Sequence, residues 1–156
     1  MNAMMRSGVL AVCGMAAIAP ASGVAAKKPA TKALATTLTG AAEVPNPGDP
    51  NGKGSAVVRF NERRGTVCFK ITVKGIAGSS AAHIHRAPVG VAGPVVVPLF
   101  ASQSNAKQRR GCVKDVERSL VREILANPRG FSVNVHNAEF PTGALRGQFR
   151  GKPKTR

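Results

Sequence analysis

Three histidines are the residues of this chain whose types and spacing could do chemistry. His83 and His85 lie in the stretch AAHIHRAP, and His136 lies much further along, in FSVNVHNAEFP. On an extended strand, residues i and i+2 point to the same face, so His83 and His85 are expected side by side. Two such imidazoles can share one Zn²⁺ or Cu²⁺ ion, and a third gives the ligand count of an open metal site.

The third histidine joins this pair only if two strands meet. Ser132, Asn134 and His136 share the polar face of the predicted strand FSVNVH, which contains the third histidine. If the polar faces meet, or the strands pair, the three histidines converge. Three histidines are too few for the two-metal centre of a copper–zinc dismutase, so a single bound ion is the metal hypothesis.

Two other interpretations stay open. The histidines could form structural hydrogen bonds with the backbone and with Asn134, Arg86 or Glu139, and so fix strand register. Acid–base catalysis needs an orienting carboxylate, and none neighbours the HIH motif in sequence, although Glu139 and Glu43 could approach in space. Arg146 is predicted as an ion-pair partner of Glu139 or as an anion contact.

Other catalytic sites leave no trace in the sequence. Ser79 and Ser80 lack the GxSxG pattern of a nucleophile elbow, and no paired carboxylates occur at short spacing. The glycines around Gly93 lack the strand-to-helix setting of a phosphate-binding loop. We therefore predict a protein that is not an enzyme.

The chain is expected to begin with a signal peptide over residues 1–26. One positive charge is followed by a short apolar run, then by small residues before the lysines, and cleavage between Ala26 and Lys27 is predicted. The run is too short to span a bilayer, so no transmembrane segment is expected in the mature chain. The predicted destination is the periplasm or the outside of the cell.

Two cysteines, Cys68 and Cys112, remain after the signal peptide. In an exported chain, two cysteines most simply form one disulfide. A metal-bound pair and a reactive thiol are the alternatives, but a CxxC spacing is absent.

The mature chain is strongly basic. Without Arg6, 22 basic residues face 7 acidic ones, a formal charge of +15. This balance predicts attraction to anionic envelope or extracellular polymers, with another protein as the alternative partner. Nucleic acid is not the expected partner, because Trp and Tyr are absent and no basic stretch is interleaved with aromatics for base stacking.

The elements expected to position these residues are short strands. A flexible basic linker (27–36) precedes one domain (37–151), and a basic tail (152–156) follows. Within the domain, runs rich in Val, Ile, Thr and Phe alternate with Gly, Pro and Asn, and predict seven or eight strands. One helix is expected over 116–127, with Asp115 as its cap. The pattern predicts an all-β fold, a single Greek-key antiparallel β-sandwich with one helical crossover.

Several stretches resemble the CHRD domain family. They are AEVP, GSAVVRF, AAHIHRAPVGVAGPVVVPL, ANPRGFSVNVHNAEFPTGALRGQF and the two cysteines, and they extend from about Leu38 to Gly151. The resemblance implies an extracytoplasmic sandwich of immunoglobulin-like or superoxide-dismutase-like type. It implies little about activity, because the family is defined by sequence and has no settled biochemical role.

Overall fold

The structure is a computed structural model that describes residues 31–151 and 154–155. The expected signal peptide and its junction between Ala26 and Lys27 lie outside these residues. Sheet structure begins at Lys32, inside the segment 27–36 that was expected to be a linker. No helix of the described residues is long and apolar enough to cross a membrane.

The described chain is mostly β. Its strands are β1 (Lys32–Thr39), β2 (Lys53–Asn61), β3 (Thr66–Lys74), β4 (Ser79–Arg86), β5 (Val95–Ser104), β6 (Gln108–Val113), β7 (Phe131–His136), β8 (Leu145–Gln148) and β9 (Lys154–Thr155). Its helical segments are α1 (Arg118–Ala126) and the 3-10 turns η1 (Gly40–Ala42), η2 (Glu62–Arg64) and η3 (Pro128–Gly130).

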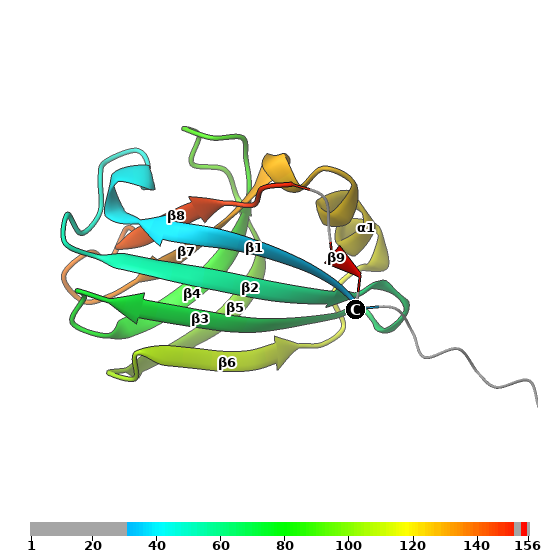
Figure 1. Cartoon of the computed structure of the whole chain (residues 1–156), viewed down its shortest axis with the longest axis horizontal. Helices are drawn as coiled ribbons and strands as arrows, with labels where there is room; N and C mark the ends of the chain where they lie inside the picture. Colours follow the sequence, from blue (N-terminus) through cyan, green and yellow to red (C-terminus); the bar gives the residue numbers. More distant parts are fainter. Residues whose placement is uncertain (1–30, 152–153, 156) are drawn as a thin grey trace, which may run out of the picture.

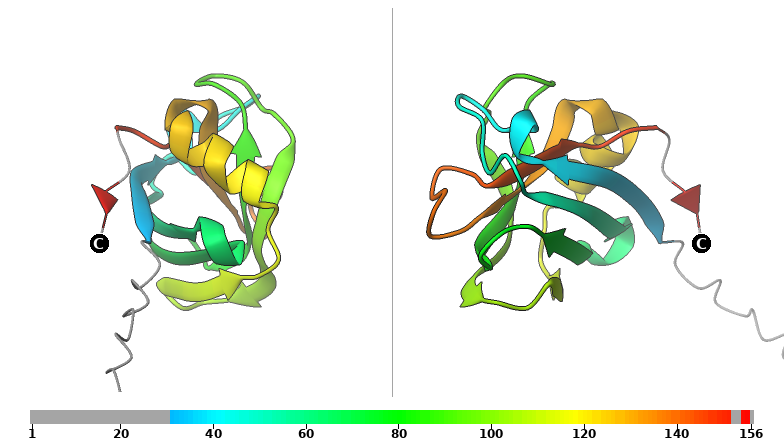
Figure 2. Two further views of the ribbon diagram at one scale, coloured as in Figure 1. Left: turned by 90° about the vertical axis from the view of Figure 1, so that its right-hand side faces the viewer. Right: turned by 60° about the vertical axis from the view of Figure 1, so that its left-hand side comes forward.

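All of these strands lie in one antiparallel sheet. The order is β5-β4-β7-β8-β1-β2-β3-β6, and β9 pairs with β1 outside this path. The two end strands, β5 and β6, follow one another in the chain, so the sheet curls round until its edges approach (Figures 1 and 2). The mostly β prediction is confirmed, whereas a division into two sheets is not, because one path joins the strands.

Arg109 of β6 bridges the two edges of the sheet. Its guanidinium donates hydrogen bonds to the backbone oxygen and the hydroxyl of Ser102 on β5, at 2.9 and 2.7 Å. It also lies over the ring of Phe100, 4.1 Å from the ring centre. These contacts make the sheet a nearly closed, barrel-like structure.

The core lies on the inner face of the curled sheet. The strands alternate apolar and polar residues, so their apolar side chains point to this inner face. In β3, Val67, Phe69, Ile71 and Val73 are buried, while the residues between them face outward. Helix α1 lies across one end, seen nearest the viewer in the left panel of Figure 2, and buries Val121, Ile124 and Leu125.

The helix differs at its start from the sequence prediction. Asp115 has a φ of 57° and does not cap the helix, which begins at Arg118 after Glu117. The predicted end is confirmed, because Asn127 is the C-cap and Pro128 follows.

Strand β6 was not predicted, because its sequence QRRGCV holds only one strongly apolar residue. Its Cys112 lies directly opposite Cys68 of β3 in the sheet register. The two cysteines form the disulfide, with a sequence separation of 44 residues. The bond therefore fastens an edge strand from the outer face of the sheet and leaves the core untouched.

Candidate metal centre

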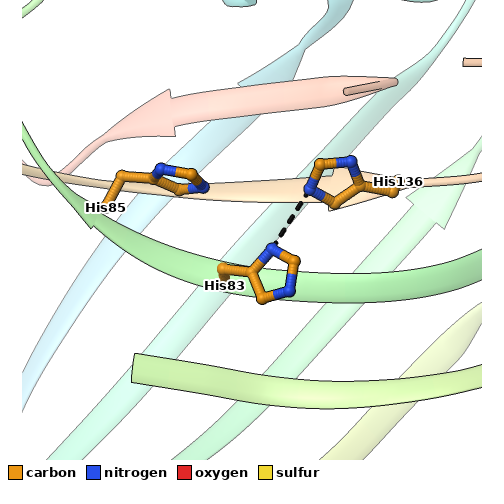
Figure 3. Close-up of side chains that lie close together, drawn as sticks. All are labelled: His83, His85 and His136. Carbon is orange, nitrogen blue, oxygen red and sulfur yellow. Dashed lines mark hydrogen bonds between the residues drawn. The ribbon is translucent and has the colours of Figure 1, made fainter. Parts of the chain in front are cut away.

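The three histidines converge because β4 and β7 are neighbours in the sheet. His83 lies directly opposite Asn134, and His136 lies opposite Ala81, one step along the same outer face. Ile84, between His83 and His85, points into the core and is fully buried. The alternation of β4 and its register with β7 thus place three imidazoles together, as Figure 3 shows.

The distances between the rings suit a shared ion. His83 Nδ1 and His136 Nε2 are 3.1 Å apart. One ligand nitrogen from each ring can be chosen so that all three lie within 4.8 Å of one another. Nitrogens around a tetrahedral Zn²⁺ would be roughly 3.3 Å apart, given bonds of about 2.0–2.1 Å, so the most widely spaced rings would have to move up to about 1.5 Å closer.

Backbone carbonyls fix the orientation of two of the rings. His85 Nδ1 donates to Gly93 O at 2.8 Å, and His136 Nδ1 donates to Pro141 O at 3.0 Å. A carbonyl oxygen has no hydrogen to give, so both hydrogens are assigned to Nδ1, and in the neutral rings Nε2 carries the lone pair. Metal-binding histidines commonly use this arrangement, in which the second nitrogen donates to a backbone carbonyl.

The loop between β4 and β5 supplies one of these carbonyls by a close approach. A Cβ at Gly93 would lie 2.0 Å from the backbone oxygen of Arg86, so a larger residue there would push the loop away from His85. Arg146 and Gln148 of β8 also hold this loop, by donating hydrogen bonds to Val91 O and Ala87 O.

The amide of Asn134 lies between the two oriented rings and can satisfy only one of them. Its Nδ2 donates to His136 Nε2 at 2.9 Å, while its Oδ1 faces His85 Nε2 at 3.1 Å. When His85 is neutral, Asn134 Oδ1 and His85 Nε2 are both hydrogen-bond acceptors, so this contact is unfavourable. If the amide is rotated by 180°, Oδ1 instead faces the acceptor His136 Nε2. A proton or a metal ion at His85 Nε2 removes the unfavourable contact between the two acceptors.

The surroundings favour the neutral form of two of the rings by lowering their pKa values. Burial lowers the pKa of His83, and the neighbouring His136 and His85 lower it further. Burial also lowers the pKa of His136, although its hydrogen bond with Pro141 opposes this effect. Because a histidine must be unprotonated to bind a metal, these shifts favour metal binding near neutral pH.

The predicted supporting residues fall into two groups. Asn134 is buried and contacts His85 and His136, as the structural interpretation expected. Glu139 is exposed in the turn after β7, and the ion pair recorded for Arg146 in the described chain is with Glu43 instead, at 3.9 Å. Of the two roles predicted for Arg146, an ion pair with Glu139 or an anion contact, the structure has an ion pair, but with Glu43 as the partner.

The Glu43–Arg146 pair was not predicted as a unit. Their side chains are 2% and 5% exposed, and neither carboxylate oxygen of Glu43 has a hydrogen-bond partner in the described part of the chain. Burial raises the pKa of Glu43 to about 7, although Arg146 lowers it. Glu43 comes from the turn after η1 and Arg146 from β8, so only the folded chain brings them together.

The comparisons with known proteins add one finding. Neither the curated proteins nor the solved structures give a match to this chain. The family model of the CHRD domain matches residues 34–149. This range holds strands β2 to β8, all but the first two residues of β1, the disulfide and the three histidines. The chain belongs to the CHRD domain family.

Proposed function

We propose that this CHRD domain is an exported, non-enzymatic protein that binds one Zn²⁺ or Cu²⁺ ion through His83, His85 and His136. The observation that carries the proposal is the orientation of His85 and His136. Each ring commits its Nδ1 hydrogen to a backbone carbonyl and turns its Nε2 lone pair toward the buried amide of Asn134.

The donor set supports this choice of metal. Zn²⁺ and Cu²⁺ prefer imidazole nitrogen, whereas Mg²⁺ and Ca²⁺ prefer oxygen ligands. Three histidine ligands leave a fourth position for water or for a donor from a partner. The rings are half-buried, so an ion can reach them from solvent.

The proposal that the domain is not an enzyme rests on the lack of a carboxylate that would orient a histidine for proton transfer. In the described part of the chain the hydrogen-bond partners of the three rings are another ring, the Asn134 amide and backbone carbonyls. Glu43 is instead buried against Arg146. The disulfide supports export, since such bonds persist in oxidising compartments.

Calorimetric titration of the chelator-treated protein with Zn²⁺ and with Cu²⁺ tests the proposal. We expect one ion per chain, with binding lost or weakened at least roughly a hundredfold in His83→Ala and in His136→Ala, because each removes a ligand. Ser132→Ala is the matched control: Ser132 lies opposite His85 on β7 but has no ligand nitrogen. A folded wild type that binds neither ion would leave the histidines as a structural hydrogen-bond cluster.

A further inference from the structure

The outer face of β2, β3 and β6 is cationic. The inward positions of these strands belong to the core, so the alternate positions face outward. Five basic residues occupy outward positions, and together they define the cationic face: Lys53, Arg59, Lys70, Lys74 and Arg110.

The sheet register places four of these cations opposite one another in two pairs. Lys53 lies opposite Lys74, and Lys70 lies opposite Arg110. Like charges directly opposite each other on neighbouring strands destabilise a sheet. The fold therefore concentrates positive charge here at a cost to its own stability.

No acidic side chain neutralises this face. The seven acidic residues of the chain all lie outside β2, β3 and β6: Glu43, Asp49, Glu62, Asp115, Glu117, Glu123 and Glu139. The ion pairs recorded in the described residues use other cations, namely Arg86, Arg122 and Arg146. A surface of one sign attracts and retains counter-ions of the other sign.

A hollow lies at one end of the cationic face. It has a volume of about 450 Å³, and Lys53 and Lys74 stand at its border. Thr37, Ser55 and Thr72 also line it, and most of its lining surface is apolar. The hollow thus places two ammonium groups, which can pair with an acid group, at the border of a mostly apolar surface that a sugar ring can cover.

We propose that the cationic face binds an acidic polysaccharide, a chain of sugars that carries carboxylates at regular intervals. The exposed Thr37 and Ser55 lie beside Lys53, and their hydroxyls match the hydroxyl groups of sugars. This binding is independent of the proposed metal site, whose histidines lie on β4 and β7.

Two other polyanions fit the face less well. A nucleic acid is favoured by aromatic side chains for base stacking, but Phe60 and Phe69 of these strands are buried in the core. A membrane surface is favoured by apolar residues that insert, but the exposed large apolar residues of the described chain are elsewhere, at Val89, Val91 and Val95.

The test uses a double variant, Lys74→Glu with Arg110→Glu. It turns both like-charge pairs into opposite-charge pairs, so we expect a melting temperature equal to or above that of the wild type. Arg118→Glu with Arg129→Glu is the matched control, since it makes the same change of net charge at exposed positions on α1 and η3.

Binding is measured by calorimetry with polygalacturonate at several salt concentrations. We expect wild-type affinity to fall steeply with salt, and to fall roughly tenfold or more in the face variant and only slightly in the control. Equal losses in both variants would overturn the proposal, because net charge alone would then explain the binding. No binding by the wild type at low salt, or tighter binding to anionic vesicles or to single-stranded DNA, would also overturn it.

Discussion

His83 Nδ1 lies 3.1 Å from His136 Nε2, although 53 residues separate the two histidines along the chain. At this distance two ring nitrogens need a hydrogen on one of them or a cation close to both. The same contact therefore couples the site to pH and to metal ions, and both dependences can be measured.

The stability of the metal-free protein is expected to fall as the pH falls below 6.5. Burial lowers the pKa of His83 and of His136 in the folded state from the ordinary value of 6.5. Between the folded and unfolded pKa values the unfolded chain binds more protons, so acid favours unfolding. The stability is present above pH 6.5 and is lost as the pH falls through the folded values.

Urea unfolding from pH 8 to pH 5 checks this effect. The free energy of unfolding of the wild type is compared at each pH with that of His83→Gln/His136→Gln, so that contributions from other groups cancel. The difference should change below pH 6.5. A constant difference across this range would show that the two rings titrate normally in the folded state.

Glu43→Gln should remove a pH dependence of the opposite sign. With the pKa of Glu43 raised from 4.5 to about 7, the folded chain binds the extra proton between these values. The wild type should therefore lose up to roughly 3 kcal/mol of stability as the pH rises through this window. The variant should lose none of it.

Glu139→Gln is the control for this measurement, because Glu139 is exposed. It should retain the wild-type pH dependence in the same unfolding experiment. A Glu43→Gln curve parallel to that of the wild type would mean that Glu43 ionises at its ordinary pKa despite its burial.

Asn134→Asp should tighten Zn²⁺ binding. The new carboxylate would lie beside the Nε2 atoms of His85 and His136, where it can bind the ion itself as a further ligand. We expect an affinity increase of roughly tenfold or more, on the scale of changes beside metal ligands. Zinc titration against the wild type measures it, and weaker binding would contradict the proposed position of the ion.

Loss of the disulfide should destabilise the fold without removing the metal site. The Cys68→Ser/Cys112→Ser variant should lose about 2–4 kcal/mol, because the bond closes a long loop and fastens the edge strand β6. Hydrogen exchange should become faster in β6 before it does in β4 and β7. Unchanged unfolding midpoints under oxidising conditions would show that the bond contributes nothing.

The sequence allowed part of this site to be predicted, and the reason is strand periodicity. His83 and His85 had to share a face because they are two residues apart on a strand, and the structure places them so. The pairing of β4 with β7 was only one of several options, since register between distant strands depends on the whole core. The same limit explains why Glu43 was not assigned to Arg146 and why one continuous sheet was not foreseen.

Other details were missed because they depend on backbone atoms or on context. The carbonyls of Gly93 and Pro141 orient two rings, yet a residue type says nothing about where its carbonyl oxygen points. Strand β6 is basic and carries little apolar pattern, and its place at the sheet edge beside β3 makes it a strand. Asp115 looked like a helix cap, but its positive φ places it in the turn before the helix.

The central claim is that three ring nitrogens hold one metal ion, and a crystal structure of the zinc-loaded protein with anomalous scattering at the zinc edge tests it most directly. We predict one anomalous peak per chain, about 2.0–2.1 Å from His85 Nε2, His136 Nε2 and a nitrogen of His83. The claim would be contradicted by a zinc peak elsewhere in the molecule. It would also be contradicted if the His83–His136 contact remained unchanged, with no zinc peak next to these two rings.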